Sequence, residues 1–426
     1  MPVNSTTGYL IAGPGTFNVN AHNLDLGATL GIRSLGPLNN PALAPLANSG
    51  AAINVNLTGN LDMFSTTISS IAGGDISVNA GGYVSVGSST FSSSDNVPRG
   101  IFTVAKADVS VIAGGNINVN GSRIASYDGG DITVESLHGS INAGRGASTP
   151  VSVTGYYVDP ATHGVYQNGP QLPFSGIMAL TFPPRDSNYP RSAANIGSIL
   201  IEAPNGDVTA DTSGILQIAL NNLKYPSALV YVLAGYELRD QAGNPVFASN
   251  MGGATPVAGS GGKDINANGS GIIASNVKLD ASGNVNGLIF ARNNIDITAQ
   301  QNINVTALGQ GNVSVSSSGG TISGSIIGVG GVTAVGNSIE ASLVSANVTG
   351  STSGQNGLGG GGAANNAANS ASANAEAPAA AKTFDNAEGE ELTKKKGIPL
   401  MQKVSRVTVI LPPKNMSEKT QSNNPL

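Results

Sequence analysis

The residues best suited to catalysis are carboxylates near the middle of the chain. Asp207 and Asp211 stand four residues apart in the stretch NGDVTADTSG, shortly after Glu202. Alternate side chains of an extended strand share a face, so Asp207 and Asp211 could act together as acid and base on a glycosidic bond. Charged residues that precede them are Arg185, Asp186 and Arg191. Aspartates beside glycine are more often turn residues, so we predict no catalytic residue and no enzyme.

Metal and cofactor chemistry finds little support in the sequence. Cysteine is absent, and His22, His138 and His163 lie far apart without the spacing of metal ligands. The Gly-Gly-Asp phrases that start at Gly73 and Gly129 lack the spacing of calcium-binding β-roll repeats. The other glycine-rich phrases do not precede a helix of a nucleotide-binding unit. We therefore expect neither a metal nor a cofactor.

The composition is typical of a large exported protein. Of the 426 residues 58 are Gly, only 11 % are charged, and the net charge is −5 without a basic stripe, so nucleic acid is not an expected partner. The sequence contains no run of about 18 apolar residues, so we expect no transmembrane segment. Because the start, MPVNS, lacks the features of a signal peptide, we expect the chain to be the C-terminal part of a longer protein.

Short repeats between Gly283 and Gly350 predict the fold. Each copy has a turn residue, a β-branched residue, a small polar residue and another apolar residue, and successive copies start 7 to 10 residues apart. The copies begin at Ile295, Ile303, Val313, Ile322, Val332, Ile339 and Val348. Their alternation indicates strands with one buried face, and they are too short to include helices. We predict an all-β fold, a parallel β-helix in which two phrases of roughly 18 to 20 residues form one rung about 4.8 Å high.

The same phrases occur earlier in the chain, where asparagine is frequent. The phrases GGDISVNAGG, GGNINVNGS and GGDITVES begin at Gly73, Gly114 and Gly129. In the second of them Ile117 and Val119 face one way and the neighbouring asparagines face the other. Stacked Asn or Ser side chains could form ladders along the coil, although asparagine is also a common turn residue at corners.

Two excursions interrupt the repeats and provide the candidate binding residues. The first, at 151–195, is rich in Pro and Tyr, and the second lies near 223–258. The tyrosines predicted to make contacts are Tyr156, Tyr157, Tyr166, Tyr189 and Tyr236. The alternative is that these loops fold onto the coil and cover its apolar side. Locally, we expect one or two helical turns at 215–223, a strand at 228–233 and a hairpin at 238–247 that turns at 240–243.

The composition divides the chain into five parts. Residues 1–150 form β-helix rungs, 151–195 form the first excursion, and 196–350 form further rungs that include the second excursion. Residues 351–396 form a flexible low-complexity and charged linker, and 397–426 form a tail with one strand near 404–411. That strand could dock on the open end of the coil or act as a secretion element.

The repeat phrases, including ARNNIDITAQQNINVTALGQGNVSVSSSGG, resemble those of filamentous haemagglutinin-like exoproteins, the secreted partners of two-partner secretion. The resemblance covers roughly Gly73 to Gly350. It implies a right-handed β-helix, export through an outer-membrane pore, a secreted or cell-surface location, and adhesion to host or neighbouring cells, matrix or glycans. The N-terminal secretion module of the family, with its Asn-Pro-Asn motifs, has no counterpart here, and no binding residue of the family matches this sequence.

These observations favour a structural and adhesive protein, in which a rigid β-helical stalk presents loops for attachment. One alternative is a β-helical polysaccharide lyase or glycoside hydrolase for acidic glycans, although the absence of Trp counts against it. Another alternative is a protein that assembles itself into a surface fibre or sheath.

Overall fold

The computed structural model describes residues 8–36, 50–87, 99–144, 175–181, 195–211, 213–219 and 228–352, and the backbone of four short strands between 151 and 172. All of these belong to a compact unit, Met1–Ala375. Their regular structure is β except for one 3₁₀ turn, η2 (Ala248–Asn250), which confirms the predicted all-β class. A second unit, Glu376–Leu426, lies outside the described residues, as do most of the predicted linker and the predicted strand at 404–411.

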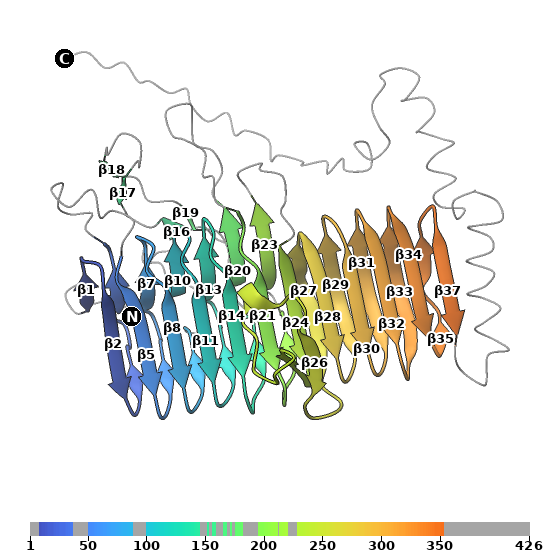
Figure 1. Cartoon of the computed structure of the whole chain (residues 1–426), viewed down its shortest axis with the longest axis horizontal. Coiled ribbons are helices and arrows are strands. Elements are labelled where there is room, and N and C mark those ends of the chain that lie inside the picture. The colour runs from blue at the N-terminus through green and yellow to red at the C-terminus, as the bar shows by residue number, and fades with distance from the viewer. Residues whose placement is uncertain are drawn as a thin grey trace, which may run out of the picture. The chain divides into compact units, whose positions relative to one another are not determined.

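The described strands wind into a parallel β-helix, as predicted, and stack from one rung to the next (Figure 1). One face of the coil is a 12-stranded parallel sheet. In chain order its strands are β2 (Thr16–Ala21), β5 (Ala52–Leu57), β8 (Ile76–Ala80), β11 (Val109–Ala113), β14 (Ile132–Ser136), β21 (Ile199–Ala203), β24 (Leu229–Ala234), β28 (Asn276–Ala281), β30 (Ile295–Ala299), β32 (Asn312–Ser317), β34 (Gly331–Gly336) and β37 (Val348–Thr352). We call it the long face.

A 19-stranded sheet forms the other two faces. The second face has β3 (Leu24–Asp25), β6 (Leu61–Asp62), β9 (Val84–Ser85), β12 (Ile117–Asn118), β15 (Ile141–Asn142) and β22 (Val208–Thr209). The third face has β1 (Tyr9–Ile11), β4 (Ile32–Ser34), β7 (Thr67–Ser70), β10 (Gly100–Val104), β13 (Arg123–Tyr127), β20 (Gly176–Thr181) and β23 (Gly214–Ala219). Further along the coil, four longer strands each span both of these faces: β27 (Ile265–Ala274), β29 (Val285–Ala291), β31 (Ile303–Gly309) and β33 (Thr321–Gly328). After them β35 (Ser338–Ile339) continues the second face and β36 (Ser342–Val344) continues the third.

The core is a column of β-branched residues inside the coil. Ile53 stacks on Ile76, which stacks on Val109 and then on Ile132, so that each buried side chain lies against its counterpart in the next rung. These side chains are almost fully buried. Val and Ile suit this packing because their branched side chains fit a pleated surface. Burial of such apolar columns, one for each inward position of a face, is therefore what closes the coil.

Two of the strands that span both faces bend at a glycine that a residue with a side chain could not replace without strain, whereas β31 has Val305 at the equivalent position. Gly287 in β29 and Gly324 in β33 have φ values of +112° and +98°, which L-residues with a side chain rarely adopt. In both cases an added Cβ would collide with a carbonyl oxygen of the preceding rung. Close backbone approach and positive φ together explain why β29 and β33 have glycine at the bend.

Rung length agrees with the prediction in the C-terminal half of the coil. Asn276, Asn294 and Asn312 stack on one another at a separation of 18 residues. Earlier rungs are longer: Asp75 and Asp108 are 33 residues apart. The estimate of 18 to 20 residues therefore holds only where two faces are combined in a single bent strand.

The local predictions for the second excursion were partly correct. The helical turns expected at 215–223 are wrong over 215–219, because Gly214–Ala219 is strand β23, stacked on β20, and residues 220–223 lie outside the described residues. The strand expected at 228–233 is confirmed as β24. The hairpin expected at 238–247 is present, with its turn at 240–243 and an antiparallel bridge between Arg239 and Pro245. In addition, β25 (Tyr236–Arg239) pairs with the more distant β26 (Thr255–Ala258).

We expect Gly324→Ala to lower the free energy of unfolding by at least about 2 kcal/mol, because it adds both backbone strain and a collision with the preceding rung. Gly261→Ala is the matched control, since a Cβ there meets nothing within 4 Å and φ is not positive. Denaturant unfolding followed by circular dichroism measures both. Equal stability of the two variants would contradict this account of the bend.

Candidate functional site

The predicted aspartate pair does not lie on an extended strand. Asp207 and Asp211 flank β22, which has only two residues, so the expected shared face is wrong. Asp207 occupies the corner before β22, where its Oδ1 accepts a hydrogen bond from the backbone N–H of Asp264 at 2.8 Å. Glu202 lies on another face of the coil, and Arg185, Asp186 and Arg191 lie outside the described residues. The structure thus assigns Asp207 a corner role.

Asp207 belongs to a ladder of side chains that follows this corner along the coil. Each side-chain oxygen accepts a hydrogen bond from the backbone N–H of the equivalent residue one rung later. The successive acceptor–donor pairs are Asn23–Asn60, Asn60–Tyr83, Asn116–Ser140, Ser140–Asp207, Asp207–Asp264, Asp264–Asn284, Asn284–Asn302 and Asn302–Thr321, at 2.7 to 3.1 Å. The corner N–H groups, which turn away from the sheets, are satisfied in this way.

A second ladder follows the corner before the long face. Its pairs are Asp75–Asp108, Asp108–Asp131, Asp131–Ser198, Ser198–Leu229, Asn276–Asn294 and Asn294–Asn312. Burial raises the pKa of Asp108, the N–H of Asp131 lowers it, and the charges of Asp131 and Asp75 raise it. Stacked carboxylates therefore repel one another, and the later rungs use neutral asparagine instead.

The predicted asparagine ladders are confirmed on the strands as well as at the corners. On the outer side of the long face Asn54 donates its amide to Asn18 at 3.1 Å, and Asn79 donates to Asn56 at 3.2 Å. Many asparagines of the repeat therefore hold one rung to the next, in addition to being turn residues.

We expect Asp207→Ala to lower the free energy of unfolding by about 1–2 kcal/mol, because the N–H of Asp264 loses its acceptor. Asp207→Asn keeps an acceptor oxygen in the same place and should change stability much less. Thermal and denaturant unfolding of both variants test this. If the two variants are destabilised equally, the ladder bond is not what Asp207 contributes.

Two glutamates form a buried pair on the outer side of the long face. Glu135 and Glu202 are in register on β14 and β21, and they are only 8 % and 2 % exposed. Residues 236–258, which we call the hairpin platform, cover them. Glu202 Oε2 accepts a hydrogen bond from the N–H of Leu238 at 3.4 Å, while its Oε1 has no hydrogen-bond partner. This carboxyl group is thus almost completely removed from water.

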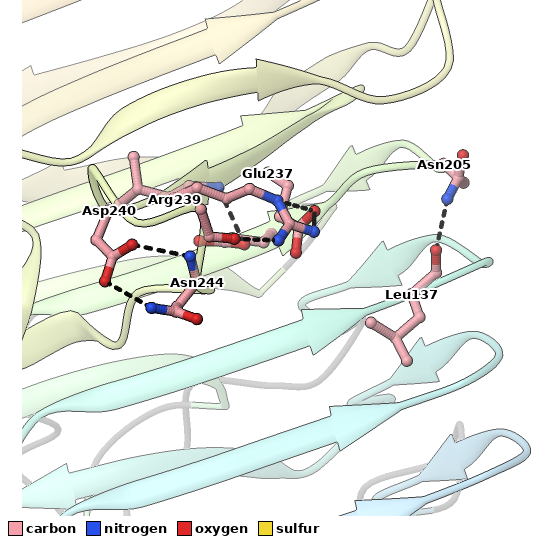
Figure 2. Close-up of polar contacts among 9 residues, drawn as sticks. Leu137, Asn205, Glu237, Arg239, Asp240 and Asn244 are labelled. Atoms are coloured by element: carbon pink, nitrogen blue, oxygen red, sulfur yellow. Dashed lines mark hydrogen bonds and ion pairs between the residues drawn. The ribbon is translucent and has the colours of Figure 1, made fainter.

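The hairpin platform has its own apolar cluster and its own polar turn. Leu238, Val246 and Ala248 of the hairpin platform pack against apolar residues on the outer side of the long face. The residues of the long face are Leu200, Tyr231 and Leu233. At the turn, Arg239 donates to Glu237 Oε2 at 3.0 Å and to the carbonyl of Gly243 at 2.6 Å (Figure 2). The Asp240 carboxylate accepts hydrogen bonds from the backbone N–H and the side-chain amide of Asn244, and these bonds lower the pKa of Asp240. The platform is therefore a folded layer with a rigid tip.

The pKa of Glu202 is raised to about 8, first by burial under this layer and then by the nearby charges of Glu135 and Glu237, while the N–H of Leu238 and the charge of Arg239 oppose the shift. Burial also raises the pKa of Glu135. A protonated carboxyl group beside a carboxylate is an arrangement used in glycoside cleavage. Here the hairpin platform closes it off from any polymeric substrate, so the pair fits a structural role better.

We expect Glu202→Gln to become more stable relative to the unmodified protein as the pH rises from about 4.5 to 8. In that window the folded protein keeps the Glu202 proton that the unfolded chain loses, so stability falls by on the order of 1.4 kcal/mol per pH unit. The exposed Glu340→Gln is the control. Denaturant unfolding across this range is the measurement, and parallel pH profiles for all three proteins would refute the shifted pKa.

The structure places the predicted tyrosines in two different excursions. Tyr156 and Tyr157 lie on β17 (Tyr156–Val158), which pairs antiparallel with β18 (Val165–Gln167), so that Tyr157 is opposite Tyr166. Next to this hairpin in the chain, β16 (Val151–Ser152) pairs with β19 (Gln171–Leu172). Tyr189 lies outside the described residues. Tyr236 starts β25, is partly buried, and accepts a hydrogen bond from Gln300 at 2.7 Å.

Within the described residues, no group of three or more His, Asp or Glu side chains could hold a metal ion. The same residues contain no helix long and apolar enough to span a membrane. A signal for the corner acceptors was present in the sequence: Asn or Asp directly before the first apolar residue of a strand. Nothing in the sequence pointed to the buried Glu135, which sequence reasoning missed.

Comparison with known proteins supports the resemblance found in the repeats. A family model described as filamentous haemagglutinin family outer membrane protein matches residues 129–226. This segment includes β14, the β17–β18 hairpin and β23, so it covers rungs on both sides of the first excursion. No curated protein and no solved structure matches the chain. The family description agrees with a secreted or surface location.

Proposed function

We propose that this chain is the rigid β-helical part of a secreted or cell-surface adhesive protein, which attaches to cells, matrix or glycans through its excursions. One observation carries the proposal: the coil keeps its register across the first excursion. Asp131 accepts a hydrogen bond from the N–H of Ser198, 67 residues later, and Asn205 donates to the carbonyl of Leu137 at 2.6 Å (Figure 2). An insertion that leaves the scaffold unchanged is typical of a binding loop.

The β17–β18 hairpin is the best candidate for the contact region. It has three tyrosines within two short paired strands, and the family match spans it. Tyrosine gives a large contact area at low entropic cost, and its hydroxyl group can hydrogen-bond to a glycan or a peptide. Tyr236 is a weaker candidate because its hydroxyl is already paired with Gln300.

We expect replacement of Tyr156, Tyr157 and Tyr166 by Ala to reduce attachment at least about tenfold, which corresponds to roughly 1.4 kcal/mol of binding free energy. The β circular-dichroism signal and the unfolding temperature should not change. Tyr83→Ala is the matched control, since Tyr83 is an exposed tyrosine at a corner of the coil. Retention of the purified chain on cells, matrix proteins and a glycan array is the measurement.

Two outcomes would contradict this proposal. If the triple variant attaches as well as the unmodified chain, the hairpin is not the contact region. If incubation with the purified chain releases reducing ends from acidic polysaccharides, and Asp207→Asn abolishes this release without lowering the stability of the chain, the chain is an enzyme. The Asn variant suits this purpose because it keeps an acceptor in the corner ladder.

A further inference from the structure

The two chain connections of the hairpin platform leave the coil side by side. The chain enters the platform at Gly235, directly after β24, and returns at Gly259, whose N–H donates to the carbonyl of Gly235 at 2.9 Å. Beyond this point Ser260 is tied to the coil again, because its N–H donates to the carbonyl of Pro204 at 3.0 Å. The platform is therefore joined to the coil along one edge, through two glycines, which accept changes of φ and ψ more easily than other residues.

Few polar contacts hold the platform against the coil. Among the described residues, three hydrogen bonds link the platform to the rungs below it. The N–H groups of Leu238 and Ala248 donate to Glu202 Oε2 and Thr133 Oγ1, both at 3.4 Å, which is long for a hydrogen bond. The third bond involves Tyr236, next to the connection with the coil. Away from that edge, the apolar cluster and the contact with Glu202 are thus the main attachments.

The closed platform gives Glu202 little support for a negative charge. Its Oε2 has only the long bond from Leu238, and its Oε1 is buried without a hydrogen-bond partner. Glu135, in register on β14, would place a second carboxylate beside it. A buried carboxylate that lacks donors and has a like charge as neighbour is costly. The closed arrangement therefore favours a neutral Glu202.

The other charged and titratable groups around this carboxyl group do not compensate for its charge. On the platform, Arg239 donates to Glu237 Oε2, so its positive charge is already shared with a nearby carboxylate (Figure 2). On β24, the hydroxyl of Tyr231 donates to Asp280. Lys278 is engaged there as well, since its Nζ lies 4.0 Å from Asp280 Oδ2. Each of these groups has a partner other than Glu202.

We propose that the hairpin platform is a lid operated by the proton of Glu202. While Glu202 carries the proton, the platform stays on the long face. When the proton is lost, the platform swings away about its two glycine connections, and the carboxylate returns to water. The movement uncovers the outer side of the long face, where Leu200, Tyr231 and Leu233 form an apolar surface.

The direction of the pH effect follows from the raised pKa of Glu202. Under the closed lid, burial raises this pKa to about 8, whereas an open lid returns it toward the ordinary value of 4.5. Between these two values the closed form keeps a proton that the open form has lost. The ratio of open to closed lid therefore rises about tenfold for each pH unit and levels off above the higher value. Burial raises the pKa of Glu135 too, and Glu135 thus acts in the same direction.

The test uses the fact that the chain has no cysteine, so that one introduced thiol reports on one position of the full-length chain. Ala248→Cys places the thiol under the lid, and Ala299→Cys places it in the core of the coil. Ala242→Cys, at the exposed tip of the platform, is the matched control. The rate of reaction with iodoacetamide is measured between about pH 6 and 8, and division by the rate of the exposed control removes the ionisation of the thiol itself.

We expect the corrected rate of Ala248→Cys to rise about 100-fold over these two pH units, because the open fraction rises about tenfold per unit. Ala299→Cys should stay unreactive, since the coil itself does not open. When Ala248→Cys is combined with Glu135→Gln and Glu202→Gln, the rise should disappear, because neutral amides of the same shape replace both titrating groups under the lid.

A corrected rate that is independent of pH, or that rises equally in the glutamine variant, overturns the proposal. Labelling of Ala299→Cys in step with Ala248→Cys does so too, because the whole coil then unfolds. If Ala248→Cys reacts as fast as the exposed control even at the lowest pH, the substitution itself lifts the platform, and hydrogen exchange of the unmodified chain replaces it. The amides of Leu238 and Ala248 should then lose protection as the pH rises, after correction for intrinsic exchange, while those of β30 keep theirs; unchanged protection of all of them excludes the lid.

Discussion

The structure depends on one hydrogen bond repeated along the corners of the coil, from the backbone N–H of one rung to a side-chain oxygen of the rung before. At a corner the backbone leaves the sheet, and the side-chain oxygen supplies an acceptor for its N–H, in bonds that are exposed at some rungs and partly buried at others. Asp, Asn and Ser are short enough to reach back one rung and do so at both corners. Together with the backbone hydrogen bonds between stacked strands, this contact fixes the register of one rung on the next.

Because the ladder acts between neighbouring rungs and not between neighbours in sequence, the length of chain between two rungs matters little. Asp131 reaches Ser198 across 67 residues, and Asn284 reaches Asn302 across 18, with the same geometry. Insertions can therefore grow at a corner without disturbing the core, and the entropic cost of a longer loop rises only slowly with its length. This explains how one scaffold holds both a short regular half and a half with large excursions.

The sequence predicted the features that depend on local pattern. Alternation placed Ile117 inside, and the frequency of asparagine predicted ladders. One or two helical turns were expected at 215–223, but stacking on β20 places Ile215 in the core and Ile218 on the outer side of the sheet. Tertiary pairing outweighs a weak local preference in such short segments.

The sequence did not predict features that depend on contacts between distant rungs. Asp207 was a candidate acid because a corner acceptor and a catalytic carboxylate have the same side chain and the same glycine neighbours. Glu202 appeared to be one of a charged group, but residues that follow it by more than 30 positions cover it. Its raised pKa arises from that cover, which no pattern within one strand encodes.

The direction of the ladder has a consequence for the ends of the coil. In each corner bond of the two ladders, the earlier rung supplies the oxygen and the later rung supplies the N–H, so the coil has a donor end and an acceptor end. The corner bonds thus give the coil a direction that its parallel sheets alone do not have, since the edge of a sheet carries both N–H and C=O groups.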